Sequence, residues 1–191
     1  MSAPATKDTR RGIFLVTGAQ AAGKSTIGRL LAGRFERGAF VEGDLMWKLV
    51  VSGAQDMGGD HASDEAVRQY LLRLRHGAML ADSLYDNDFT AVHADIVMGE
   101  SLAPYIGMVR NRPLYIVMLY PSIEAVVARE RARPKTAYRD LGPTLEDAVR
   151  TFYRWIDATE RIGLWLDTGD QTPEQTVDEI LERVWSEGLI A

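Results

Sequence analysis

The nine residues from Gly18 to Thr26, GAQAAGKST, constrain the fold of this chain more than any other part of its sequence. They follow an apolar run, Ile13 to Thr17, and carry two glycines, a lysine and two hydroxyl residues in the spacing G-x-x-x-x-G-K-[ST]. Glycines at these positions let consecutive backbone N–H groups turn toward one anion, and the helix that follows adds the positive end of its dipole. The segment therefore predicts a strand, a phosphate-binding loop and a helix, in that order.

The side chains at the end of this loop suit a nucleotide. Lys24 can reach the β- and γ-phosphates, and Ser25 can offer its hydroxyl to Mg²⁺. A tight glycine turn that only enters a helix needs neither the lysine nor the hydroxyl, so we favour nucleotide binding. The residues predicted to bind the nucleotide here are Gly18, Ala19, Gln20, Ala21, Ala22, Gly23, Lys24, Ser25 and Thr26.

Short apolar runs alternate with longer helical patterns along the chain. Apolar residues three and four apart, Val67, Leu71, Leu74 and Ala78, predict a helix over 64–82, and Thr172 starts the last helix with a capping pattern. Strands that alternate with helices indicate an α/β fold with a parallel sheet and right-handed crossovers. Five runs have the length and composition of buried strands: 13–17, 39–42, 90–94, 114–119 and 164–167.

Length and composition suit one domain. A chain of 191 residues, 46% of them hydrophobic, can bury one sizeable core, and we divide it into a flexible N-terminus, 1–10, and a single domain, 11–191. The net charge of −5 disfavours nucleic acid or an anionic membrane as the main partner. Without cysteine there is no disulfide or thiolate metal site. The chain also has no secretory signal pattern and no membrane-length apolar run, which predicts a cytoplasmic protein, either a monomer or a homodimer.

Two carboxylates follow predicted strands. Ligands of a parallel α/β sheet bind at the carboxyl ends of its strands, and Asp44 and Asp95 come directly after the second and third runs. Beside a γ-phosphate, one carboxylate can accept the proton of an attacking hydroxyl and a second can hold Mg²⁺ directly or through water. Asp44 could instead cap the helix after it, and Asp95 could cap a loop or bind the substrate.

Arginines gather after the fourth predicted strand, in EAVVARERARPKTAYRD. Phosphoryl transfer spreads negative charge over the phosphate oxygens, so an arginine that closes over them stabilises the transition state. The segment therefore predicts an arginine-rich lid at about 130–143, whereas the alternative is a solvated helix end with arginine–glutamate pairs. Glycine, proline and polar residues also predict mobile loops at 53–63 and 134–143.

The phosphate loop, Asp44, HADIVMG and ARERAR together resemble the kinase branch of the phosphate-loop proteins, and most closely the chloramphenicol phosphotransferase family, whose relatives include gluconate and shikimate kinases and the zeta toxins. The resemblance implies a P-loop NTPase three-layer sandwich: a five-stranded parallel sheet ordered 2-3-1-4-5 with helices on both faces and a lid. It also implies ATP as the phosphate donor, Mg²⁺ as the counter-ion and a hydroxyl group as the acceptor.

The resemblance assigns roles by position. Asp44 corresponds to the general base, and Asp95 to the second aspartate of a pair whose first position here is Ala94. Lys24 and Arg133 act on the transferring phosphate, and Ser25 holds Mg²⁺ with Asp95 or Asp44 reached through water. Arg129, Thr168 and Gly169 lie near the adenine. The acceptor pocket is expected in the parts of the chain that match the family least, and the residues expected to contact the acceptor are Asp44, Trp47, Arg68 and Asp95.

Three functions remain open at this point. The leading hypothesis is a kinase that phosphorylates a hydroxyl of a small molecule, such as an antibiotic or another secondary metabolite. A second is a nucleotide-sugar or polynucleotide kinase similar to the zeta toxins. The third is a regulatory ATPase that binds nucleotide without transferring phosphate, although the sequence lacks the Asn-Lys pair with which guanine-nucleotide switches read their base.

Overall fold

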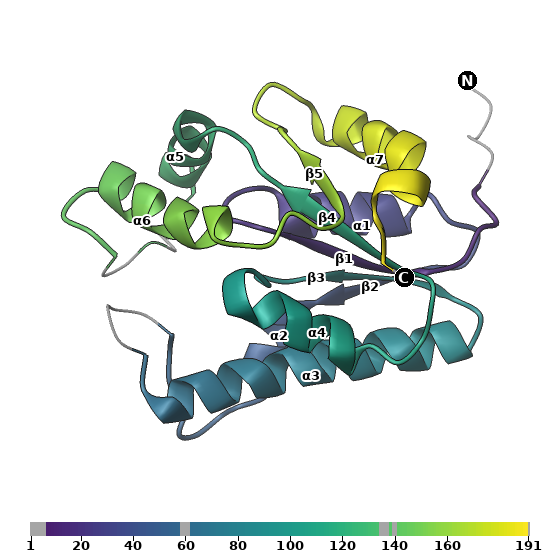
Figure 1. Ribbon diagram of the computed structural model, residues 1–191, viewed down its shortest axis with the longest axis horizontal. Helices are drawn as coiled ribbons and strands as arrows, with labels where there is room; N and C mark the ends of the chain where they lie inside the picture. Colours follow the sequence, from purple (N-terminus) through teal and green to yellow (C-terminus); the bar gives the residue numbers. More distant parts are fainter. Residues whose placement is uncertain (1–6, 58–61, 134–137, 139–140, 191) are drawn as a thin grey trace.

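The computed structural model describes residues 7–57, 62–133, 138 and 141–190. Its sheet has the predicted parallel order, β2-β3-β1-β4-β5 (Figure 1). A further strand, β6 (Leu189–Ile190), pairs antiparallel with β4 and was not predicted, because two residues are too few to show a strand pattern. The five parallel strands are β1 (Ile13–Gly18), β2 (Gly38–Glu42), β3 (Thr90–Ala94), β4 (Leu114–Leu119) and β5 (Leu164–Leu166).

Helices cover both faces of this sheet, so that the three-layer architecture is confirmed (Figure 1). Phe14 and Val16 of β1 pack toward the face covered by α1, α5, α6 and α7, whereas Ile13 and Leu15 pack toward α3 and α4, because side chains alternate along a strand. The helices are α1 (Lys24–Ala32), α2 (Gly43–Trp47), α3 (Asp64–Asp86), α4 (Leu102–Met108), α5 (Ile123–Arg131), α6 (Leu145–Asp157) and α7 (Pro173–Glu187), with a 3₁₀ turn, η1 (Gly99–Ser101).

Capping residues set the ends of the long helices. Ser63 accepts a hydrogen bond from the backbone N–H of Ala66 and starts α3, which runs to Asp86, beyond the predicted end at 82, because no glycine or proline interrupts it there. Thr172 and Gln175 form the predicted capping box at the start of α7, each side chain bonding the other's backbone N–H.

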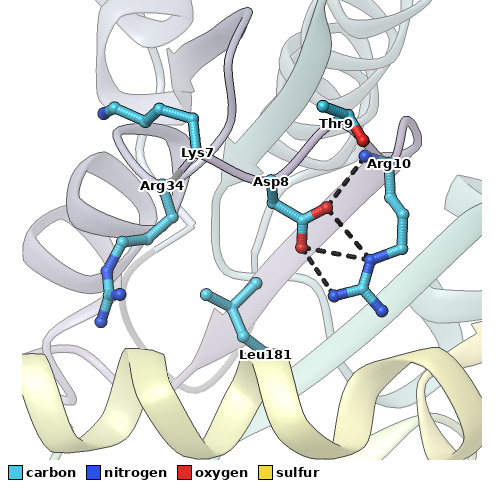
Figure 2. A pocket seen from close by; sticks show the side chains of 6 residues that line it. All are labelled: Lys7, Asp8, Thr9, Arg10, Arg34 and Leu181. Atoms are coloured by element: carbon cyan, nitrogen blue, oxygen red, sulfur yellow. Dashed lines mark hydrogen bonds and ion pairs between the residues drawn. The ribbon is translucent and has the colours of Figure 1, made fainter. Parts of the chain in front are cut away.

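The N-terminal segment meets the fold far from the phosphate loop. Asp8 pairs with Phe35 in an isolated bridge, and Arg10 bonds the Asp8 carboxylate in a hollow of about 380 Å³ that lies past the C-terminal end of α1 (Figure 2). The nine residues of α1 separate this hollow from the loop by about 13 Å. Residues 1–6 of the predicted flexible N-terminus lie outside the described residues, as do 58–61, 134–137 and 139–140 of the two predicted mobile loops.

Candidate active site

The loop between β1 and α1 has the backbone that its glycines predict. Gly18 has a φ of 142°, and a Cβ atom there would lie 2.3 Å from the carbonyl oxygen of Leu119. Gly23, with a φ of 100°, precedes the first residue of α1. Ala21 also has a positive φ, 60°, a strained conformation for a residue with a side chain. The loop thus turns its backbone toward the N-terminus of α1, where N–H groups and the helix dipole favour an anion.

Lys24 is the cation of this loop. Its Nζ donates a hydrogen bond of 2.7 Å to the carbonyl oxygen of Ala19. Burial lowers the pKa of Lys24 to about 8, and the negative charges of Asp95 and Asp44 only partly offset this effect. A phosphate that enters the loop would therefore lie beside the poorly hydrated ammonium group of Lys24. The negative charge of the phosphate would in turn favour the protonated form of the lysine. Ser25, the next residue, is exposed.

Asp44 lies in the first turn of α2, directly after β2. The residue at the N-cap position of α2 is Glu42, so Asp44 does not have the capping role that its sequence position allowed. Its carboxylate is 72% exposed, and its Oδ1 lies 3.3 Å from Nη2 of Arg73. Asp44 is therefore an acid that a ligand can reach from solvent, and it lies beside the partly buried Arg73.

Asp95 follows β3 and is buried. Arg73 of α3 binds both of its carboxylate oxygens, with Nε 2.9 Å from Oδ2, and the backbone N–H of Ile96 donates to Oδ1 at 2.7 Å. Burial by itself would raise the pKa of Asp95, but the neighbouring imidazole of His93 and the positive charge of Arg73 outweigh it and hold the pKa at about 2. Asp95 is thus an ionised anchor for Arg73.

Arg73 joins the two predicted carboxylates, and the sequence analysis missed it. In the predicted apolar stripe of α3, Leu74 and Ala78 are buried as expected, but Val67 is 38% exposed. Ala66 and Gly77, which the stripe did not include, are also buried, so the buried face extends toward small residues on the side of the helix that carries Arg73. A signal was present: Arg73 lies four residues before Gly77 and therefore on the same side of the helix.

Arg129 of α5 connects two predicted nucleotide-binding segments. Its guanidinium donates to the carbonyl oxygens of Thr168 at 2.6 Å and Gly169 at 3.3 Å, and to that of Ala22 in the phosphate loop at 3.4 Å. The structure therefore brings together the three residues expected near the adenine, and places them against the phosphate loop.

The described part of the lid makes a second contact with the loop. The Tyr138 hydroxyl donates to the carbonyl oxygen of Gln20 at 2.7 Å, and its ring packs edge-on against Phe152 of α6. No sequence pattern pointed to Tyr138. Arg133 is half exposed and pairs at 3.2 Å with Glu130, whose side chain is buried. The guanidinium of the lid arginine expected near the phosphates is therefore paired with Glu130, and its side chain is half exposed.

One predicted acceptor contact, Arg68, lies apart from this cluster. Arg68 is exposed and forms an ion pair with Glu65, one turn away on α3. Arg68 and Arg73 are five positions apart, which turns the helix by about 140°, so the two arginines point in different directions. Trp47, the last residue of α2, is partly buried.

The fold is that of solved phosphate-loop kinases. A sugar kinase from Janibacter sp. HTCC2649 superposes with a TM-score of 0.64 at 18% identity, over 91% of this chain and 94% of its own. A shikimate kinase from Acinetobacter baumannii, solved with shikimate, gives 0.63 at 19% identity over 92% and 94%. The tunicamycin resistance protein of Deinococcus radiodurans gives 0.63 at 16% identity over 95% and 99%.

No protein-family model matches the chain, and no curated protein matches its sequence. Among the helices that the structure describes, none is long and apolar enough to cross a membrane.

Proposed function

We propose that this protein is an ATP-dependent kinase that transfers the γ-phosphate of ATP to a hydroxyl of a small molecule. One observation carries the proposal: Asp44, an exposed carboxylate held by Arg73, lies close enough to Lys24 of the phosphate loop to influence its pKa. Phosphoryl transfer to a hydroxyl needs a phosphate cradle, a cation beside it and a base for the acceptor proton. The similarity of the fold to solved kinases supports the same activity.

The residues of the site also fit Mg²⁺. This ion prefers oxygen ligands, keeps several waters and is held largely by the nucleotide phosphates, so it needs only one or two protein groups. The hydroxyl of Ser25 and the carboxylate of Asp44 are both exposed, whereas both oxygens of Asp95 are bound by Arg73. We therefore assign Mg²⁺ to Ser25, with Asp44 reached through water. When bound, the ion neutralises charge on the phosphates.

Residues of the chain bind the nucleotide, accept the proton of the acceptor and stabilise the transition state. Backbone N–H groups of the loop and Lys24 hold the phosphates, and Arg129 fixes the segment at Thr168 against the loop so that the adenine has a defined border. Asp44 accepts the proton of the acceptor hydroxyl as its oxygen attacks the γ-phosphorus. Arg133 moves onto the phosphate oxygens as the lid closes, where it stabilises the charge of the transition state.

For the acceptor, we propose a compound without a carboxylate, such as an antibiotic or another secondary metabolite. Leu45, Leu49 and Val51 follow Asp44 in the chain and are 50%, 63% and 95% exposed, so the segment after Asp44 presents apolar side chains to solvent. Arg73, the partly buried arginine beside Asp44, already forms an ion pair with Asp95. Similarity to the tunicamycin resistance protein supports an antibiotic as one candidate.

The test is ATP consumption by purified protein with Mg²⁺ against a panel of sugars, polyols, nucleosides and hydroxylated antibiotics, with mass spectrometry of the products. A product heavier by one phosphate is expected, and Asp44→Asn should abolish its formation. Asp56→Asn, an exposed acid in the loop before α3, is the matched control and should retain activity. Tight ATP binding without transfer to any compound, and without dependence on Asp44, would favour a regulatory nucleotide-binding protein instead.

A further inference from the structure

A buried histidine lies directly behind the Asp95–Arg73 pair. His93 is on β3, two residues before Asp95, and is fully buried. Its Nδ1 lies 2.8 Å from the hydroxyl of Tyr105 on α4, which is fully buried as well. Its Nε2 has no hydrogen bond of ordinary length within the described part of the chain and lies 3.6 Å from Oδ2 of Asp95. The imidazole therefore stands between a tyrosine and a carboxylate.

Hydrogen-bond chemistry selects one tautomer of the neutral imidazole. Burial keeps the pKa of Tyr105 above its ordinary value, so the hydroxyl holds its proton and can donate it to Nδ1. A neutral histidine that accepts at Nδ1 carries its proton on Nε2, which faces Asp95. The opposite form would turn a nitrogen lone pair toward a carboxylate oxygen, and the two would repel.

Two glycines make room for this arrangement. A Cβ atom at Gly77, inside α3, would lie 2.2 Å from Cε1 and 2.3 Å from Nε2 of His93. A Cβ atom at Gly43, where β2 meets α2, would lie 2.1 Å from Oδ2 of Asp95. A glycine inside a helix costs stability relative to alanine. The α3 helix and the junction of β2 and α2 therefore each have a glycine, without a side chain, where the imidazole of His93 and the carboxylate of Asp95 pack.

We propose that His93 is a positioning residue: Tyr105 fixes its tautomer, its Nε2–H holds the carboxylate of Asp95 in place, and Asp95 in turn holds Arg73 beside Asp44. The series Tyr105, His93, Asp95, Arg73 and Asp44 runs from the buried core between α3 and α4 to the solvent-exposed acid. Only the catalytic consequence of this series rests on the proposed kinase function, because the positioning of Arg73 can be measured without any substrate.

The experiment measures the Nε–H proton of Arg73 and the nitrogens of His93 by NMR in the full-length protein labelled with ¹⁵N. In the wild type, His93 is expected as the neutral Nε2–H tautomer, and the Arg73 Nε–H proton is expected to exchange slowly with water. His93→Leu removes the donor and should speed that exchange about tenfold, the effect of one lost hydrogen bond to a charged group. His93→Gln keeps an N–H donor and should restore most of the protection.

Val92→Ala is the control for a general loss of stability, because Val92 is the neighbouring buried residue of β3 and packs on the opposite face of the sheet. An Nδ1–H tautomer of His93, or Arg73 exchange in His93→Leu no faster than in Val92→Ala, would overturn the proposal. Should His93→Leu fail to fold, Tyr105→Phe decides: a changed tautomer with faster Arg73 exchange supports the proposal, and no change in either refutes it.

An activity assay then separates this proposal from the proposed function. With an acceptor from the panel, His93→Leu is expected to lower kcat while the KM for ATP stays constant, and His93→Gln should recover part of kcat. If no acceptor is phosphorylated at all, the kinase function fails while the exchange result for Arg73 still stands.

Discussion

Replacing Lys24 with methionine is expected to stabilise the ligand-free protein while abolishing its use of ATP. Methionine keeps the unbranched apolar part of the side chain but removes the ammonium group, which burial makes unfavourable in the phosphate loop. A site that must bind phosphate has to keep a cation where folding alone would not place one, so stability and function oppose each other at this position.

The size of the effect follows from the pKa of Lys24, which falls from 10.5 to about 8. A difference of about 2.5 pKa units corresponds to a cost of at most about 3 kcal/mol in the free energy of unfolding at pH 7. Methionine also loses the hydrogen bond to Ala19, which is worth about 1 kcal/mol. The expected net gain is therefore about 2 kcal/mol.

The pH dependence has a definite sign. The folded protein releases the Lys24 proton at a lower pH than the unfolded chain, so wild-type stability rises, relative to the variant, between about pH 8 and pH 10.5. The advantage of Lys24→Met should be complete below pH 8 and should shrink across that range. Groups other than Lys24 titrate in both proteins, so their contributions cancel in the difference.

The measurement is urea denaturation of both proteins from pH 7 to pH 10, with exposed Lys48→Met as a control that should change stability by less than about 0.5 kcal/mol. Addition of Mg²⁺ and ATP should raise the melting temperature of the wild type but not of Lys24→Met. A variant less stable than the wild type at pH 7, or a stability difference that stays constant with pH, would refute the reasoning.

Three further outcomes follow from the site. Arg129→Gln should weaken ATP binding about tenfold or more, since it removes hydrogen bonds that join the loop to its neighbour, whereas Arg131→Gln, on the surface, should leave the Kd measured by calorimetry unchanged. The pKa of Asp95, about 2 against an ordinary 3.8, contributes about 2 kcal/mol of stability that is lost as the pH falls through this interval, and Asp95→Asn should lack that acid dependence in urea titrations. Arg133→Ala should lower kcat with little change in the KM for ATP, and an unchanged kcat would exclude its role in the transition state.

Sequence patterns predicted the parts of the site that are close together along the chain. The spacing of Gly18, Gly23 and Lys24 was enough to predict the phosphate loop. The glycines allow the backbone conformation of the loop and the lysine provides the cation, and all three lie within a few residues of one another. The parallel sheet also followed from the sequence pattern, since buried strands alternating with helices allow few topologies, whereas the strand order came from the resemblance to phosphate-loop kinases. The resemblance to chloramphenicol phosphotransferases in particular remains a prediction, since the solved neighbours share the fold at low identity.

The contacts that were missed join residues far apart in sequence. Tyr138 bonds Gln20 across 118 positions, and Arg73 bonds Asp95 across 22. Hydrophobic periodicity placed α3 and two of its buried residues, Leu74 and Ala78, but missed part of the buried face, because the pattern counts large apolar residues and most of that face is built from small ones. A helix that packs closely on a sheet needs such small residues, so the large residue Val67 turns outward.

The small residues nevertheless carry information that periodicity leaves out. Gly77 lies inside the 23-residue helix α3, where a glycine lowers stability relative to alanine. In the structure, the ring of His93 occupies the space that a side chain at position 77 would fill. Arg73 lies four residues earlier, on the same side of the helix. A charged residue one turn from a glycine inside a helix can therefore indicate, in the sequence, a polar cluster whose other members are distant along the chain. The spacing of Arg73 and Gly77 indicates which face of the helix carries the cluster, whereas its partner on the sheet, Asp95, can be identified only from the folded structure.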